Sequence, residues 1–419
     1  MKLNSLSASS LSRALGRKEI SAEELCRDSL SRIRRVEERI NAFSVVFEER
    51  ALRDAKRADE RRAKGEELHP LDGIPIALKD TIHIQDEPGD PGETADYEAE
   101  IAARCRKAGL VLLGKTSTGW PSGARNPYNP TRVAGTDSGG AAACLAVGEA
   151  PLSIGTDLGG ALRVAASYCG VMGLRPTDGA ISARGVMTRS PIMDVPGPMA
   201  RCVSDIKLLL DLLREPVAGE RMEEAVVWQV DIPDARGLRV GLPNMPFPPE
   251  PGPDESMEIQ YAVRCLEDVG AKIVKVDIAI PRNVPDLHDA LTRLEGFEDA
   301  YKTAQTDSLE VEWEFTKAFR QCDILLAPVS AKVAPHAGTG AGPEQPWLHE
   351  NATLSGVDLA GLPAMTLPCG FAHAMPIGLQ LIAPRWHENN LLRLAYAYEC
   401  LVGPPGLARM QDVDPMNDF

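Results

Sequence analysis

Apolar and polar positions at the start of the chain follow a helical period. Between residues 21 and about 64, apolar side chains recur at roughly helical spacing among many charged ones, which predicts two amphipathic helices. Ser21 and Glu24 form a capping-box pattern, in which a hydroxyl and a carboxylate satisfy the free N–H groups of a helix start. We therefore expect residues 1–65 to be a helical segment packed on the rest of the chain.

After this segment, short apolar runs alternate with helical stretches. Strands are expected at residues 74–79, 110–115 and 152–157, and within 235–245, 270–279, 322–330, 364–370 and 377–384. Helices are expected within residues 96–108, 138–151, 254–270 and 389–403, and a Gly/Pro-rich surface loop at 338–346. This alternation indicates an α/β fold, with a sheet covered by helices on both faces.

Charge and hydropathy exclude several classes of protein. The mean hydropathy is −0.16 and no apolar run approaches the length of a membrane span, so we expect no membrane partner. The N-terminus lacks a long apolar stretch, which favours a cytoplasmic protein without a secretory signal. The net charge of −15 disfavours a nucleic-acid partner, because such surfaces gather lysine and arginine against phosphates.

The nine cysteines are scattered and odd in number, with no CxxC pair or Cys/His cluster. Neither a zinc site nor a disulfide framework is indicated, so we expect buried thiols and no metal.

Candidate chemistry begins with Lys79, at the end of the apolar strand in "GIPIALKD". A surface lysine is the commoner situation. Burial by this strand would favour the neutral amine, which can act as a base. A second feature is "GTDLGGALR", a Gly-Gly turn after a strand. Free N–H groups of Leu158, Gly159 and Gly160 in such a turn are candidate donors to an oxyanion.

Together these segments resemble the amidase signature family. The likeness runs from about Leu6 to Gly403 and rests on "PLDGIPIALKDTI", "NPYNPTR", "SGGAAA", "PLSIGTDLGGALR", "YCGVMGLRPTDGAIS", "DVPGPMAR", "LAGLPAMTLPCGF" and "PIGLQLIAP". The resemblance implies a single mixed β-sheet surrounded by helices, with residues 1–419 forming one domain. It also implies hydrolysis of carboxamide C–N bonds by a Ser–cis-Ser–Lys triad, without metal or cofactor.

Carried over by position, the resemblance assigns the family's base to Lys79. The nucleophile position holds Ala161, and the cis-serine position holds Asp137, while Ser138 keeps the family's next serine. The 24-position separation of Asp137 and Ala161 matches the family's, so a gap does not explain the mismatch. One triad member of three is therefore present.

Two explanations of Ala161 stay open. A laboratory substitution that traps a substrate would explain Ala161 alone. Natural divergence also explains Asp137 and the chain between Lys79 and Asp137, which is shorter than is usual in the family. There "QDEPGDPGE", residues 85–93, stands where relatives help to wall the substrate site.

Other attacking groups are less favoured. Cys144 and Cys169 are expected to be packed thiols, and Ser138 would attack only a substrate docked about one residue away from its usual place. The Lys79 ammonium is expected within hydrogen-bond distance of Asp137 or Ser138, and an ion pair with Asp137 would favour the charged form of each partner. As an alternative, Asp137 acts as a general base on a water that fills the space left by Ala161.

The sequence thus leaves two classes of function. One is an amidase-type C–N hydrolase that acts on a small carboxamide-type substrate, with altered or silenced chemistry. The other is a pseudoamidase without catalysis, which binds a ligand or a partner protein. Both a homodimer and a separate partner subunit remain open.

Overall fold

The structure is a computed structural model. It describes residues 2–85, 97–118, 123–214, 233–244, 250–281, 283–292, 298–337 and 352–403, without the side chains of 298–305, 307 and 352. The loop predicted at 338–346 and nearly all of 85–93 lie outside these residues.

The strands of the described residues form one sheet. They are β1 (Phe43–Val46), β2 (Pro75–Lys79), β3 (Val111–Thr116), β4 (Leu152–Asp157), β5 (Met172–Arg175), β6 (Val195–Ala200), β7 (Arg239–Pro243), β8 (Lys272–Val276), β9 (Ile324–Pro328), β10 (Ala364–Ala372) and β11 (Met375–Ile382). Their order across the sheet is β1-β3-β2-β4-β6-β5-β10-β11-β9-β7-β8. Because β2 runs parallel to β3 and β4, and β7 to β8 and β9, while the other neighbours are antiparallel, the sheet is mixed, as predicted.

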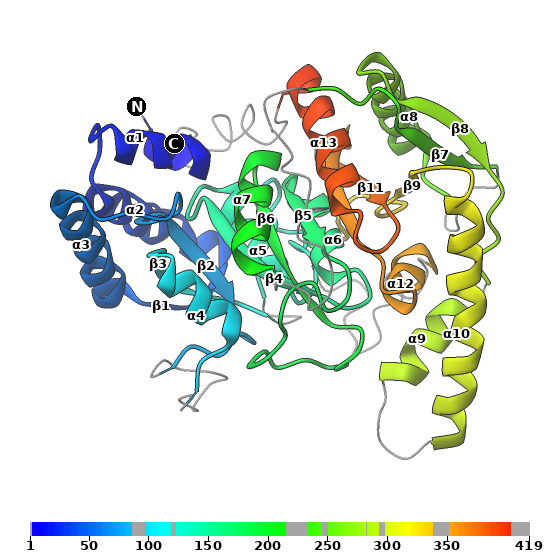
Figure 1. Cartoon of the computed structure of the whole chain (residues 1–419), viewed down its shortest axis with the longest axis horizontal. Helices are drawn as coiled ribbons and strands as arrows, with labels where there is room; N and C mark the ends of the chain where they lie inside the picture. Colours follow the sequence, from blue (N-terminus) through cyan, green and yellow to red (C-terminus); the bar gives the residue numbers. More distant parts are fainter. Residues whose placement is uncertain are drawn as a thin grey trace.

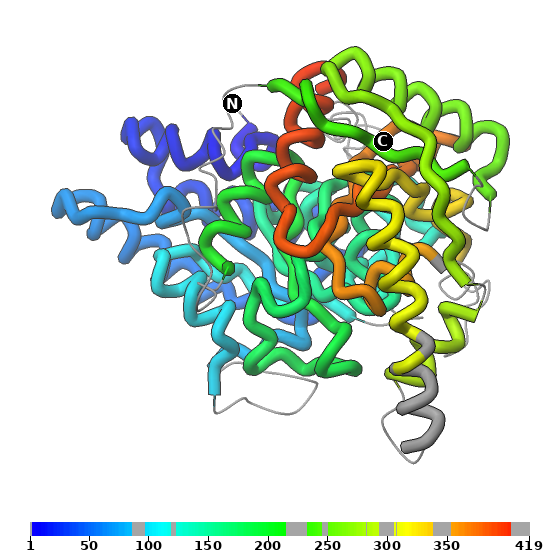
Figure 2. The backbone as a smooth tube through the Cα atoms, turned by 45° about the vertical axis from the view of Figure 1, so that its right-hand side comes forward, coloured from blue at the N-terminus to red at the C-terminus, as the bar shows by residue number. Residues whose placement is uncertain are grey.

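Helices surround this sheet (Figure 1). They are the 3-10 helix η1 (Leu3–Ser5), α1 (Ala8–Gly16), α2 (Ala22–Ile40), α3 (Glu48–Lys64), α4 (Glu100–Lys107), α5 (Gly139–Ala146), α6 (Ala161–Cys169), α7 (Val203–Leu213), α8 (Pro253–Asp268), α9 (Val284–Thr292), α10 (Glu298–Phe319), α12 (Ala352–Leu359) and α13 (Glu388–Val402). Figure 2 shows the N-terminal helices and the segment from β7 to α10 at opposite ends of the molecule. The α/β fold with one mixed sheet is confirmed, and the assignment of 1–419 to one domain stays a prediction.

The N-terminal helical segment is present as expected, with one addition. The capping box forms: Ser21 accepts from Glu24 N–H, and the Glu24 side chain accepts from Ser21 N–H. Between the two helices the chain also makes β1, which pairs with β3 at the edge of the sheet. This strand was not predicted, because a segment of four residues between two long helices is too short to reveal the two-residue alternation of a strand.

Small residues in α5 and α6 allow these helices to pack in the interior. Every residue of both helices is buried. A Cβ atom at Gly140 would lie 2.5 Å from the carbonyl oxygen of Ala42, so a larger residue there would force backbone apart. The Gly/Ala composition of α5 therefore reflects close packing at the centre of the fold.

The cysteines are free thiols rather than disulfides. Cys202 is half-buried and Cys400 is exposed, so the expectation of burial is wrong for Cys400. The buried thiols are Cys26, Cys105, Cys144, Cys169, Cys265, Cys322 and Cys369.

Among the described helices, none combines the length and apolar character needed to cross a bilayer. The described residues also contain no group of three or more His, Cys, Asp or Glu side chains arranged to hold a metal ion.

Candidate active site

Lys79 ends β2 inside the molecule. All five residues of β2 are buried, and β2 lies between β3 and β4. The Lys79 side chain is 3% exposed, and its Nζ donates a hydrogen bond to Thr156 Oγ1 at 2.7 Å. The prediction of an interior lysine is confirmed, but the partner is a threonine of β4 and neither Asp137 nor Ser138.

Ser138 is bound to the backbone of the same threonine. It precedes α5, is fully buried, and its Oγ donates to the Thr156 carbonyl oxygen at 2.7 Å. The same Oγ accepts from Thr156 N–H at 3.1 Å. These two bonds fasten the start of α5 to β4, which gives Ser138 a structural task that competes with a role as nucleophile.

The expected ion pair between Lys79 and Asp137 is wrong. Asp137 lies at the partly exposed edge of the site, with a side chain 25% exposed, and its Oδ2 is 3.4 Å from Nη2 of the exposed Arg189. No ion pair within 4.0 Å joins Lys79 to Asp137, both of which the structure describes. The physical reason is that the Lys79 ammonium donates its hydrogen bond to Thr156 instead. Ser138 is bound to the backbone of β4, and this leaves its neighbour Asp137 at the partly exposed edge of the site.

Asp194 is a buried carboxylate that sequence reasoning missed. It immediately precedes β6, is 7% exposed, and accepts from Arg189 N–H at 3.2 Å. Burial raises the pKa of Asp194, and the Lys79 ammonium is the largest of the groups that oppose this rise. Asp194 is the first residue of the segment "DVPGPMAR". This segment served only to recognise the family, and its aspartate was not considered as a site residue.

The turn between β4 and α6 brings Ala161 to the site. Gly159 and Gly160 adopt positive φ angles of 63° and 86°, which confirms the predicted Gly-Gly turn. Ala161 is the first residue of α6 and is 4% exposed. Its side chain is a methyl group, which carries no atom that could attack a carbonyl carbon.

The predicted oxyanion donors are not equivalent. Gly159 N–H donates to Asp358 Oδ2, and Ala161 N–H donates to the Leu158 carbonyl oxygen at 3.2 Å. In this conformation the N–H group of Gly159 is therefore not available as an oxyanion donor. The hydrogen bonds of the described residues assign no acceptor to the N–H groups of Leu158 and Gly160, which stay the predicted donors.

A buried ionic network stabilises the turn between β4 and α6. Sequence reasoning did not find this network. Arg163 Nη2 of α6 donates to Asp157 Oδ1 at 2.8 Å and to Asp358 Oδ1 at 2.5 Å. Arg175 Nη1 of β5 donates to the Asp157 carbonyl oxygen at 2.9 Å. Burial alone would raise the pKa of Asp358, but Arg175 and Arg163 outweigh it and hold that pKa at about 2.

His288 completes the network from α9. Its Nε2 lies 3.2 Å from Asp358 Oδ2, the same carboxylate oxygen that accepts from Gly159 N–H. The glycine turn is thus fixed by charged side chains of β4, β5, α6 and α12 and by the imidazole of α9. Asp157 and Arg163 both belong to "GTDLGGALR", whereas Asp358 and His288 lie in segments that no motif marked.

Comparisons with known proteins agree with this architecture. The family model described as Amidase matches residues 24–292 and 282–392. The chain is 32% identical over 466 residues to a glutamyl-tRNA(Gln) amidotransferase subunit from Synechococcus sp. (strain JA-3-3Ab), covering 93% of this chain and 91% of that protein. It is 32% identical over 478 residues to the protein of the same name from Chloroflexus aurantiacus (strain ATCC 29366 / DSM 635 / J-10-fl), covering 96% and 97%.

Among solved structures, a chain from the inhibitor-bound form of a vestigial protein complex, connected with the origins of an s-triazine catabolic enzyme, superposes with a TM-score of 0.83. That pair is 27% identical and covers 94% of this chain and 98% of the other. Since the 466-residue alignment is longer than this 419-residue chain, it includes gaps in this chain. On the match to its model and on its relatives, the chain belongs to the amidase family.

Proposed function

We propose that this amidase-family chain binds a carboxamide-type small molecule at the site formed by Lys79, Thr156 and the turn before Ala161, without running an acyl-enzyme cycle. The observation that carries the proposal is the methyl group of Ala161 at the start of α6. The other parts of the site are present: Lys79 is buried and has a hydrogen-bond partner, and ionic contacts fix the glycine turn.

The chemistry of acyl transfer explains why the loss of one oxygen matters. A covalent route requires an atom that attacks the carbonyl carbon and leaves as part of an ester. Where nucleophile and base act as a unit, removal of the nucleophile costs about 10⁶ in rate, as in the serine protease subtilisin. Binding of the carbonyl oxygen by the N–H groups of Leu158 and Gly160 does not need that atom, so ligand binding survives its loss.

A slow route remains through water. For this route we assign to Asp137, whose side chain is 25% exposed, the role of taking a proton from a water molecule whose oxygen adds to the carbonyl carbon. The C–N bond then breaks and the amine leaves with a proton. Because the Arg189 guanidinium lies beside Asp137 and competes with water for its carboxylate oxygens, we expect little turnover by this route.

The test measures binding and turnover together. The chain and its variants Ala161→Ser, Ala161→Gly and Asp137→Ser with Ala161→Ser are titrated with malonamide and benzamide by calorimetry, and ammonia release is followed. We expect the unmodified chain to bind at least one amide without detectable ammonia release. Ala161→Ser alone should add little, because position 137 lacks the hydroxyl that bridges to the lysine in the family. The double variant should exceed it by roughly 100-fold, and Ala161→Gly is the control for a change of size without an oxygen.

Two outcomes contradict the proposal. Failure of the unmodified chain and of all three variants to bind either amide would remove the ligand-binding claim and favour a scaffold. Brisk hydrolysis by the unmodified chain, abolished by Asp137→Asn, would show that water activation is the main activity.

A further inference from the structure

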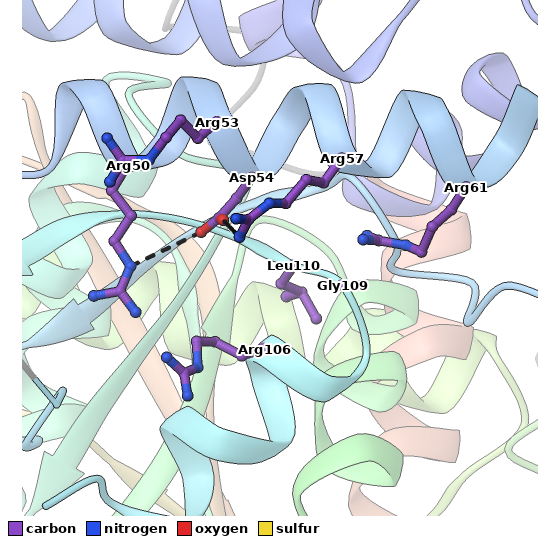
Figure 3. A pocket seen from close by; sticks show the side chains of 8 residues that line it. All are labelled: Arg50, Arg53, Asp54, Arg57, Arg61, Arg106, Gly109 and Leu110. Carbon is purple, nitrogen blue, oxygen red and sulfur yellow. Dashed lines mark hydrogen bonds and ion pairs between the residues drawn. The ribbon is translucent and has the colours of Figure 1, made fainter.

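A concave site lies between α3 and α4, formed by residues outside the site described above. It has a volume of about 370 Å³ (Figure 3). Its charged lining consists of Arg50, Arg53, Asp54, Arg57 and Arg61 of α3 with Arg106 of α4. We call it the arginine cleft.

The sequence of α3 places its arginines on one face. Arg50, Arg53, Arg57 and Arg61 follow each other at steps of three, four and four residues, which is the repeat of an α-helix surface. This row spans roughly 16 Å of the helix. Arg106 faces the row from α4, and Figure 3 shows Arg50 and Asp54 reaching from α3 toward it. The cleft is therefore positive on two opposing walls.

The contacts of Arg53 and Arg57 with carboxylates at the cleft are long. Asp54 is shared: its carboxylate is 3.9 Å from Arg50 Nε and 3.5 Å from Arg57 Nη1. Arg53 lies 3.8 Å from Glu49, at the exposed side of the helix. Such separations exceed the ~2.7–2.9 Å of a direct charge-assisted hydrogen bond. The side chains of Arg53 and Arg57 are 61% and 67% exposed and are therefore accessible to a ligand.

The remaining two arginines are held in place by tight pairs. Arg61 Nη2 donates to the buried Asp72 at 2.7 Å, and Arg106 Nη2 donates to Glu98 at 2.7 Å. These pairs fix two guanidinium groups at the edges of the cleft before any ligand arrives. Pre-fixed donors lower the ordering cost of binding.

The surrounding charge makes this cluster an exception in the molecule. The chain carries a net charge of −15, so its long-range field repels anions. Like charges at helical spacing also repel each other. The exposed guanidinium groups of Arg53 and Arg57 beside this cleft are therefore the groups best able to take an anionic ligand, and guanidinium is the side chain that matches phosphoryl oxygens in pairs.

From these observations we propose that the arginine cleft binds a small soluble anion that carries two or more phosphoryl groups. Its volume lies within the range of about 300–1,000 Å³ of small-ligand sites, which favours a small molecule over a macromolecule. The spread of arginines along α3 exceeds what one phosphoryl group can contact, which favours a polyphosphate. The acidic chain as a whole argues against a nucleic acid.

The experiment uses inorganic tripolyphosphate as the probe, with orthophosphate for comparison, in isothermal titration calorimetry of the full chain. The test variant is Arg53→Gln with Arg57→Gln. The control is Arg17→Gln with Arg236→Gln, which removes the same charge from side chains that are 72% and 80% exposed elsewhere. All four arginines are exposed, so both variants should fold, and circular dichroism verifies this.

We expect tripolyphosphate to bind at least about tenfold more tightly than orthophosphate, and the cleft variant to weaken it by roughly tenfold or more, against less than about twofold for the control. Equal weakening by the two variants would overturn the proposal, because the effect would then come from net charge. Absence of tripolyphosphate binding to the unmodified chain would also overturn it. So would tighter, Arg57-dependent binding of a single-stranded RNA oligonucleotide, which would assign the cleft to a macromolecule.

Discussion

At the scale of single residues, the polar groups of the candidate active site converge on Thr156. Its hydroxyl accepts from Lys79 Nζ, and its backbone N–H and carbonyl oxygen both bond Ser138 Oγ. One residue of β4 thus sets the positions of two side chains from β2 and from the start of α5. Lys79 remains in the interior because this hydroxyl replaces part of the hydration that its ammonium loses.

Removal of the hydroxyl should therefore destabilise the fold. Thr156→Val keeps the shape of the side chain and leaves the buried Lys79 ammonium without its 2.7 Å acceptor, so we expect a loss of about 1–3 kcal/mol in the free energy of unfolding. Thr156→Ser keeps the hydroxyl and loses only a methyl group, so its effect should be smaller. Urea unfolding of the two variants measures the difference, and a valine variant as stable as the parent would show that the hydrogen bond contributes nothing.

The burial of Lys79 was predictable from the sequence, but its partner was not. A strand such as "IPIALK" identifies itself by its apolar run, so the lysine at its end was expected inside. The partner depends on which side chain of the neighbouring strand faces Nζ, and strand order is a property of the whole sheet. For the same reason Asp137, assigned by its place in a motif, lies at the rim, while Asp194 occupies the interior.

At the scale of elements, β6 shows where pattern reasoning stops. Its sequence, "VPGPMA", carries Pro196 and Pro198, which argue against a central strand because proline donates no ladder hydrogen bond. Yet β6 lies between β4 and β5. It is tolerated because β5 pairs with β6 only at Met199 and Ala200, beyond the two prolines. The apolar strands β2, β4 and β11 have no such conflict, and their approximate positions were predicted.

The turn between β4 and α6 makes a testable claim about two glycines. Gly160 has a φ of 86°, and a Cβ atom there would lie 2.8 Å from the Cδ atoms of Leu354. Gly179 has a similar φ of 83°, with no atom within 4 Å of a Cβ. Gly179→Ala should cost only the left-handed backbone penalty, about 1–2 kcal/mol. Gly160→Ala should cost about 1–3 kcal/mol more, because Leu354 must move.

Denaturant unfolding of both alanine variants separates the two contributions. Equal losses at the two positions would mean that Leu354 shifts without cost and that contact with α12 does not restrain the turn. A larger loss at Gly160 would support the view that α12 and the turn before Ala161 are packed as one unit.

At the scale of the whole molecule, the closing helix α13 contributes a carboxyl group whose protonation is linked to folding. Glu399 is 9% exposed, and both of its carboxylate oxygens accept from Val203 N–H at 3.3 Å. Burial raises the pKa of Glu399 from 4.5 to about 7, and the nearby Asp205 adds to this rise. The folded chain therefore holds this proton more tightly than the unfolded chain does.

The sign of the pH dependence follows. Below about pH 4.5 both states are protonated, so Glu399 contributes no pH dependence; between pH 4.5 and about 7 the unfolded state loses the proton first, and stability falls as the pH rises. At about 1.4 kcal/mol per pH unit, the loss above pH 7 reaches roughly 3 kcal/mol.

Glu399→Gln cannot ionise, so we expect it to be more stable than the parent near neutral pH, by up to this amount, with the advantage vanishing toward pH 4.5. Glu60→Gln, at an exposed position of α3, is the control for loss of one surface charge. Urea unfolding over this pH range decides the matter, and a glutamine variant that gains nothing between pH 4.5 and about 8 would show that the carboxylate of Glu399 is accommodated in the folded protein without penalty.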